Sequence, residues 1–117
     1  MRAARLRRGE DIARVRSLGT SRNGTLFSLR ALATDQPAVR VAVAASRAVG
    51  GAVLRNRARR RVRETLRLAL QPRDPGSGAD LVLMARPGTL RATAAELRES
   101  IDRELDAILG SRREHRS

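Results

Sequence analysis

The strongest pattern in this sequence lies in residues 47–64, which read RAVGGAVLRNRARRRVRE. The two glycines interrupt the strand-like pattern before them, and a helix is predicted to begin near Ala52. Seven of these residues are arginine, and no acidic residue occurs before Glu64. A run this cationic either faces solvent, with strong repulsion between its charges, or faces a polyanion.

The helix predicted from Ala52 has an apolar face and a cationic face. At about 100° per residue, an arc of roughly 160° collects the side chains expected in the core. They are Leu54, Ala58, Val62, Thr65, Leu66, Ala69 and Leu70. The cationic face holds Asn56, Arg57, Arg60, Arg61, Arg63 and Arg67. Arg55 and Arg59 project onto the apolar arc, so we expect the first two turns to overhang the core and to expose both side chains.

Three strands are predicted around this helix. Apolar residues alternate over Thr25–Ala33 and over Val39–Ala45, and we expect these two segments to pair as an antiparallel hairpin. The nearly continuous apolar run Asp80–Arg86 predicts a strand that is covered on both faces. Residues 71–79 are rich in proline and glycine and predict a loop.

Two further helices are predicted at the ends of the chain. In the first, Ile12, Val15 and Leu18 mark one apolar edge, and residues 19–24 end the helix and form a turn. The second opens with a capping box, Thr93-x-x-Glu96, and ends at Gly110. Its apolar face holds Leu97, Ile101, Leu105 and Ile108. Its other face is acidic and should point away from a polyanion.

The order of strand, long helix and strand predicts a β-α-β crossover in one small sheet, and therefore the α+β class. The 117 residues suffice for one domain, which we expect to span residues 1–117. A basic arm, residues 1–8, precedes it, and residues 1–4 fit a solvated tail equally well. Residues 111–117 form a polar tail. With Phe27 as the only aromatic residue, the core must be aliphatic.

The charge is high and uneven along the chain. The formal net charge is +13, and all 25 basic residues are arginine. Residues 1–73 hold 18 arginines against four acidic residues, whereas the remainder holds seven against eight. This asymmetry favours a nucleic-acid footprint over general solubility. A solvated surface is a poor account of so many unpaired arginines.

Several other functions are disfavoured by what the sequence lacks. It has no cysteine, no apolar run long enough for a membrane span and no secretory apolar segment, so a soluble cytoplasmic protein is expected. The single histidine, His115, lies in the polar tail, and no cluster has metal-ligand spacing. We therefore expect no catalytic residue, metal site or small-molecule cofactor in the chain itself. A helix-turn-helix DNA binder is disfavoured because a predicted strand precedes the basic helix.

Residues 46–64 resemble the signature of the bacterial ribonuclease P protein subunit. The matching residues are Ser46, Arg47, Gly50, Ala52 and Val53, followed by Arg55-Asn56-Arg57, Arg59-Arg60 and Arg63-Glu64. Residues 5–19 are similar to that family's N-terminal helix, and residues 80–87 are similar to its late strand. The resemblance covers about residues 5–109. Ala48 departs from the family, which places a second basic residue there.

The resemblance implies a subunit of an endoribonuclease in which a catalytic RNA with Mg²⁺ removes the 5′ leader of precursor tRNA. The protein would not be catalytic alone. It implies a sandwich with a sheet of about four strands and a left-handed β-α-β crossover, like the second domain of a ribosomal protein of the small subunit. The implied RNA-binding residues are Arg47, Arg55, Asn56, Arg57, Arg59, Arg60, Arg61 and Arg63.

The resemblance also implies a cleft for the leader between the sheet and the first helix. Its candidate residues are Ile12, Arg16 and Arg30, where the family usually places aromatic residues. Stacking of leader bases would then require guanidinium planes, or phosphate contacts would replace it. The alternative function is a general basic RNA-binding protein, ribosomal or chaperone-like, without a processing role.

Overall fold

The computed structural model describes residues 2–74 and 78–110, so the predicted tail at residues 111–117, with His115, lies outside the described residues. Along the chain the elements are β1 (Ala4–Arg5), α1 (Gly9–Leu18), β2 (Thr20–Asn23), β3 (Phe27–Thr34), β4 (Val39–Ala45), a 3₁₀ turn (Arg47–Val49), α2 (Ala52–Leu70), β5 (Gly78–Ala85), α3 (Gly88–Arg91) and α4 (Ala94–Leu109). The predicted α+β class is confirmed.

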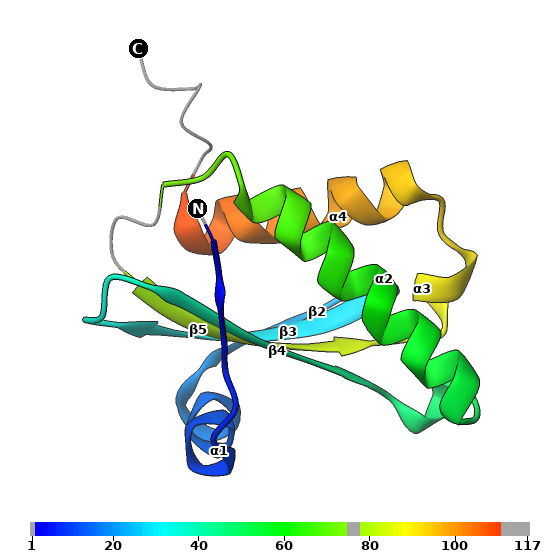
Figure 1. Cartoon of the computed structure of the whole chain (residues 1–117), viewed down its shortest axis with the longest axis horizontal. Helices are drawn as coiled ribbons and strands as arrows, with labels where there is room; N and C mark the ends of the chain where they lie inside the picture. The colour runs from blue at the N-terminus through cyan, green and yellow to red at the C-terminus, as the bar shows by residue number, and fades with distance from the viewer. Residues whose placement is uncertain (1, 75–77, 111–117) are drawn as a thin grey trace.

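The strands form one sheet in the order β1-β4-β5-β3-β2, with β5 at its centre (Figure 1). β5 pairs antiparallel with β3 and parallel with β4. The predicted hairpin of β3 with β4 is therefore wrong, because β5 lies between them. β5 is the most completely buried strand, with all but one of its residues buried. An apolar strand of this kind is stable only where neighbours cover both edges and both faces.

The described sheet has five strands rather than about four, because two short edge strands were not predicted. β1 pairs parallel with β4 through Ala4–Arg5. β2 pairs antiparallel with β3 over Thr20–Asn23, which the sequence had assigned to the end of a helix and a turn. The basic arm is thus not a free tail from residue 4 onward, and Leu6 is only 3 % exposed. Its N–H donates to the carbonyl of Val41.

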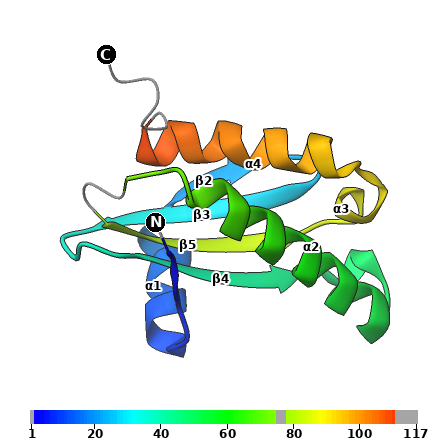
Figure 2. The same cartoon turned by 45° about the horizontal axis from the view of Figure 1, so that its top comes forward.

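The connection from β4 through α2 to β5 is left-handed. In Figure 2, where α2 lies in front of the sheet, β4 and β5 run in the same direction, and the path turns to the left of that direction. Most parallel crossovers are right-handed. The left-handed connection expected from the family resemblance is therefore what the fold has.

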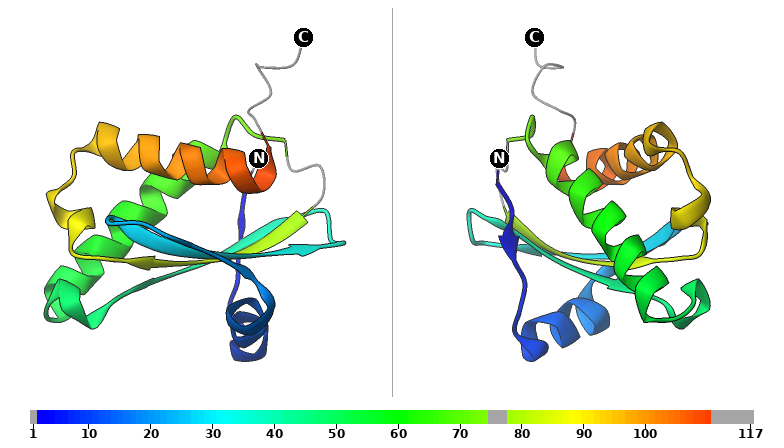
Figure 3. Two further views of the ribbon diagram at one scale, coloured as in Figure 1. Left: turned by 180° about the vertical axis from the view of Figure 1, so that it is seen from behind. Right: turned by 45° about the vertical axis from the view of Figure 1, so that its right-hand side comes forward.

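Two layers of different size cover the sheet (Figures 1 and 3). On one face α2 and α4 bury the main core, which includes Leu29, Leu81, Leu83, Val62, Leu66, Leu97, Ile101 and Leu105. On the other face α1 packs over a smaller cluster of Leu6, Val15 and Val82. Because α1 is short, it covers only part of this face, and the ends of β3, β4 and β5 near α3 have no helix over them.

α4 agrees with its sequence pattern. The N–H of Glu96 donates to Thr93 Oγ1 over 3.1 Å, and the N–H of Thr93 donates to Glu96 Oε1 over 2.8 Å. The predicted capping box is therefore present, and Leu97, Ile101 and Leu105 are buried behind it. The pattern of α1 is only partly correct, because Val15 is buried whereas Leu18 is 66 % exposed.

α2 begins at Ala52 after Gly50, whose φ of 134° lies in a region that favours glycine. Ala58, Val62, Leu66, Ala69 and Leu70 are buried, as predicted. The first turn overhangs the core, so Leu54 is 38 % exposed and its predicted burial is wrong. Arg55 and Arg59 are half-buried rather than fully exposed. The predicted exposure of both side chains is therefore only partly correct.

Arg73 joins the end of α2 to α4. It is only 3 % exposed, and its Nη1 lies 2.7 Å from Asp106 Oδ1. Its Nη2 lies 3.1 Å from Asp102 Oδ1, and its Nε donates to the carbonyl of Ala69. Two of the acidic side chains on α4 therefore pair with an arginine of the same chain.

We expect Arg73→Ala to lower the free energy of unfolding by about 2–4 kcal/mol, because it leaves these oxygens without their buried donor. Urea denaturation measures the change. The matched control is Arg67→Ala, which removes an exposed pair with Glu64 from the same helix and should leave the curve almost unchanged. Equal effects of the two substitutions would contradict the role given to Arg73.

Candidate nucleic-acid interface

The exposed side of α2 carries cations that the protein does not neutralise. Arg57, Arg60 and Arg63 are exposed, as is Asn56. In residues 2–74 and 78–110 none of these three arginines has a carboxylate partner. Arg59 donates a hydrogen bond to the side chain of Asn56. The surface from Arg55 to Arg63, called the α2 cationic face below, is therefore free to bind anions from outside.

Like charges crowd one part of this face. Partial desolvation, together with the charges of Arg5 and Arg59, lowers the pKa of the Arg63 guanidinium. Arg5 belongs to β1, so the N-terminal arm adds a cation beside α2. Sequence reasoning did not include Arg5 in the site, because a two-residue edge strand leaves no periodic signal. A phosphate bound here would relieve the repulsion between these arginines.

Arg61 differs from its neighbours. Its Nη1 donates to the carbonyl oxygens of Thr89, over 2.6 Å, and Ala92, over 2.8 Å, and the residue is half-buried. It therefore holds α3 against α2, although the helical projection had placed it on the cationic face. Thr89 is fully buried and donates in turn to the carbonyl of Leu26 at the start of β3.

A groove of about 930 Å³ lies on the part of the sheet that α1 leaves open. It brings together Arg16 from α1, Arg30 from β3 and Arg47 from the turn before α2. Ile12 is not among its lining residues and packs instead against the cluster of Leu6, Val15 and Val82. The remaining lining residues, which the sequence did not indicate, are Ser21, Asn23, Ser28, Ala45, Ser46, Met84 and Arg86.

Within the described part of the chain, the arginine side chains of the groove either donate to backbone oxygens or have no partner. Arg30 Nη1 donates to the carbonyl of Arg16 over 2.8 Å, and Arg86 Nη1 donates to the carbonyl of Gly24 over 3.0 Å. Among the residues that the structure describes, no acidic and no aromatic side chain lines the groove. The positive charge of the groove is thus not cancelled by a carboxylate in its lining.

Arg40 lies on the same face of the sheet but, unlike the arginines of the groove, it is paired with carboxylates. Its guanidinium pairs with Asp80 over 2.6 Å and with Asp11 over 3.5 Å. The hydrogen bond to Asp80 and the charges of both carboxylates raise the pKa of Arg40 against the effect of its burial. This arginine ties α1 to β4 and β5 and is not part of the candidate interface.

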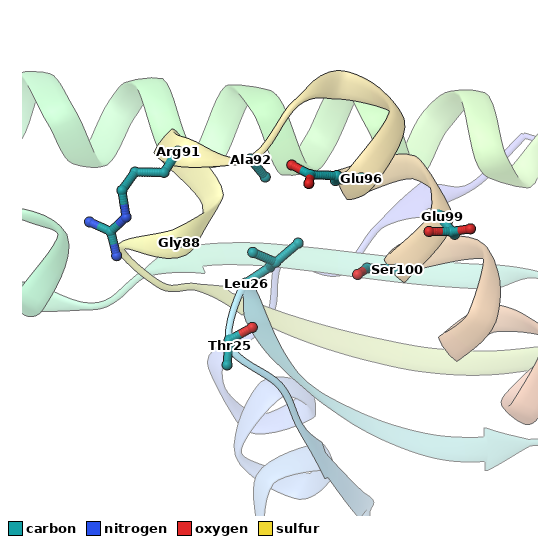
Figure 4. A pocket seen from close by; sticks show the side chains of 8 residues that line it. All are labelled: Thr25, Leu26, Gly88, Arg91, Ala92, Glu96, Glu99 and Ser100. Atoms are coloured by element: carbon teal, nitrogen blue, oxygen red, sulfur yellow. The ribbon is translucent and has the colours of Figure 1, made fainter.

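A second hollow, of about 490 Å³, lies between the start of β3, α3 and α4. Figure 4 shows Glu96 and Glu99 on its α4 side and Arg91 at its other end. Two carboxylates make it a poor place for a polyanion. Among the described residues no cluster of histidine, cysteine and acidic side chains could hold a metal ion. No helix within the described ranges is long and apolar enough to cross a membrane.

These features define an α+β protein with a cationic helix on one face of its sheet and an arginine-lined groove on the other, and the turn that holds Arg47 lies between them in the chain. The sequence model of the family described as Ribonuclease P matches residues 1–109. The chain belongs to the ribonuclease P protein family.

Relatives and solved structures agree with this membership. The ribonuclease P protein component of Gluconacetobacter diazotrophicus is 39 % identical over 106 residues, covering 89 % of this chain and 90 % of that protein. That of Streptomyces avermitilis is 39 % identical over 117 residues, covering 91 % and 92 %. The RNase P protein structure from Staphylococcus aureus has a TM-score of 0.73 at 22 % identity and covers 92 % and 96 %. That from Thermotoga maritima has a TM-score of 0.70 at 24 % identity and covers 91 % and 94 %.

We expect Arg61→Ala to lower the free energy of unfolding by about 1–2 kcal/mol, because two carbonyl oxygens lose a charged donor. Arg60→Ala, at the adjacent exposed position, should change it by less than about 0.5 kcal/mol. Thermal denaturation of both variants makes the comparison. A variant at Arg61 as stable as the one at Arg60 would show that the bonds to α3 carry no stability.

Proposed function

We propose that this chain is the protein subunit of ribonuclease P, that it binds the catalytic RNA and the 5′ leader of precursor tRNA, and that it assists endonucleolytic removal of the leader. In this proposal the RNA and its Mg²⁺ carry out the hydrolysis, and the protein works in the cytoplasm without a cofactor of its own. The observation that carries the proposal is the unneutralised charge of two surfaces, the α2 cationic face and the groove. Arg47 lines the groove and also precedes the α2 cationic face, so it links them.

The α2 cationic face is suited to a structured RNA. Each phosphate that an arginine contacts releases bound counterions, which provides affinity without sequence readout. A guanidinium also offers a planar fork for two phosphate oxygens, which a lysine cannot reproduce. We assign this contact to Arg55, Asn56, Arg57, Arg59, Arg60 and Arg63, with Arg47 at its edge. Arg61 contributes its charge to this face while its Nη1 holds α3.

The groove is suited to a single strand rather than to a duplex. It is bounded by α1 on one side and by the chain after β4 on the other, and residues from four strands or strand ends form its lining. Arg16 and Arg30 keep the roles proposed for them from the sequence, whereas Ile12 supports α1 from the core beneath it. Arg86 joins the groove because β5 ends beside β3 and β4.

The alternative is a general basic RNA-binding protein without a processing role. Family membership argues against it, and so does the division of the cations into a helix face and a groove. The two hypotheses differ in whether the assembled holoenzyme should distinguish precursor tRNA from mature tRNA. A ribonuclease P subunit should make the assembled particle bind precursor tRNA more tightly than mature tRNA, whereas a general RNA binder should show no such preference.

The assembled particle gives the direct test of the proposed function. We expect the purified chain alone to leave precursor tRNA intact, because the described residues contain no metal cluster that could activate water. Added to the ribonuclease P RNA of the source organism, it should lower the Mg²⁺ concentration required for cleavage. Cleavage by RNA-free protein that survives stringent purification would reject the assignment of the chemistry to RNA.

Substitutions on α2 test the RNA-binding face. We expect Arg57→Ala to lower affinity for the ribonuclease P RNA and to reduce the slope of log affinity against log salt by about 0.7–0.9, the loss of one phosphate contact. Arg57→Lys should recover the slope but not the full affinity, because it lacks the fork. The control is Arg103→Ala, an exposed arginine on α4 that should change neither quantity. Equal effects of Arg57→Ala and Arg103→Ala would remove α2 from the interface.

A further inference from the structure

The groove has an unusual lining for a surface that holds single-stranded RNA. It contains four arginines, four small polar residues and two apolar residues, Ala45 and Met84. Single-strand binding surfaces commonly stack bases on aromatic rings, and each stack is worth roughly tenfold to a hundredfold in affinity. The only aromatic residue, Phe27, is 5 % exposed and belongs to the core under α2 and α4. No ring is therefore available to a leader base in this groove.

We infer that the groove holds the leader through its phosphates, so that this protein recognises leaders without regard to their base sequence. The inference rests on the function proposed above and specifies how its groove works. Arg16, Arg30, Arg47 and Arg86 place four positive charges in the lining, and no carboxylate of residues 2–74 and 78–110 lines the groove to compete for them. The charged part of a nucleotide is its phosphate, so the groove attracts the backbone more strongly than the uncharged bases.

The state of each arginine supports phosphate contacts. Arg16 and Arg47 are exposed, and no hydrogen bond or ion pair of their side chains occurs in the part of the chain that the structure describes. Arg30 and Arg86 each use one Nη1 group to bind a backbone carbonyl, which fixes the guanidinium at the groove. Their remaining N–H groups have no acceptor within residues 2–74 and 78–110. Fixed donors lose less freedom when they bind an anion.

The polar residues of the lining add to the same mode of binding. Hydroxyl and amide side chains commonly contact phosphate and sugar oxygens, contacts that position a nucleic acid without reading its sequence. Ser21, Asn23 and Ser28 provide such groups. Ser46 also lines the groove, but its Oγ is buried and has no hydrogen-bond partner among the described residues. Met84 is half-buried and is the one large apolar side chain in the lining. It can touch a base but offers no pattern of donors and acceptors that distinguishes one base from another.

Chemically altered leaders distinguish binding through phosphates from binding through bases. The holoenzyme is assembled from the full chain and its ribonuclease P RNA, and its affinity is measured for mature tRNA and for precursors with a short deoxyribose leader. One leader is unmodified, one has abasic sites that keep every phosphate, and one has methylphosphonates that keep every base. We expect the abasic leader to change affinity by less than about threefold and the methylphosphonate leader to reduce it by about tenfold or more.

Each result has a definite meaning. A loss of about tenfold or more with the abasic leader overturns phosphate recognition, because one stacked base accounts for that much. Equal affinity for the unmodified precursor and mature tRNA overturns the proposed role in leader binding itself, and with it this inference. The two failures are therefore distinguishable in one series. The affinity ratio of precursor to mature tRNA should also fall with salt, with a log–log slope of up to about −3, or roughly −0.7 per phosphate contact.

Substitutions at two positions of α1 test whether this salt dependence arises in the groove. Arg16→Ala should reduce the magnitude of this slope by about 0.7, whereas Arg14→Ala, an exposed arginine on the same helix that does not line the groove, should leave it unchanged. Arg16→Tyr adds a ring where none exists, so the abasic leader should now bind more weakly than the unmodified one. Equal effects of Arg16→Ala and Arg14→Ala would overturn the assignment of the phosphate contact to the groove.

Discussion

The burial of β5 is the constraint on which the rest of the molecule depends. This strand must be covered on both faces and bonded along both edges, and β3 and β4 take its edges while the helices take its faces. The two faces are covered unequally, because α2 and α4 span one and the short α1 spans part of the other. The groove is a consequence of this inequality. Its floor consists of the strand ends that lie beyond the reach of α1.

Sequence patterns predicted which segments form helices and strands better than they predicted which strands pair with one another. The start of α2, the capping box of α4 and the existence of the apolar strand β5 all follow from local signals that do not depend on the rest of the chain. The bounds of β5 were predicted less well, because the sequence placed the strand at Asp80–Arg86 and residues 78 and 79 in a loop, whereas the strand spans Gly78–Ala85. The pairing of β3 with β5 depends on which apolar strand competes best for the centre, and alternation along a strand does not carry that information. The two short edge strands escaped prediction because two or four residues are too few for a period.

The candidate site also has one part that the sequence predicted and one part that it did not. The α2 cationic face is a local property of one helix, so spacing alone located most of it. The groove joins α1, β2, β3, β5 and the end of β4, and its members could be found together only through the sheet order. Arg86 is the clearest example, since nothing in its local sequence separates it from a solvated residue after a strand. Arg61 is an example of the reverse error. Its position on the helix predicted an exposed side chain, but in the folded chain it donates to the carbonyl oxygens of Thr89 and Ala92.

All the cations of this protein are arginines, so their roles differ only through their partners. Arg40 and Arg73 meet carboxylates, and Arg61 meets the carbonyls at the end of α3; these residues join one element to another. Arg57, Arg60 and Arg63 lack such partners in the described chain, and partial burial together with the charges of Arg5 and Arg59 lowers the pKa of Arg63. The acidic residues of α4 that pair with Arg73 lie in the helical layer, away from the groove across the sheet. Folding therefore uses the available carboxylates where elements must be joined and leaves the groove and the α2 cationic face positive, which is the charge distribution that the proposed RNA-binding role requires.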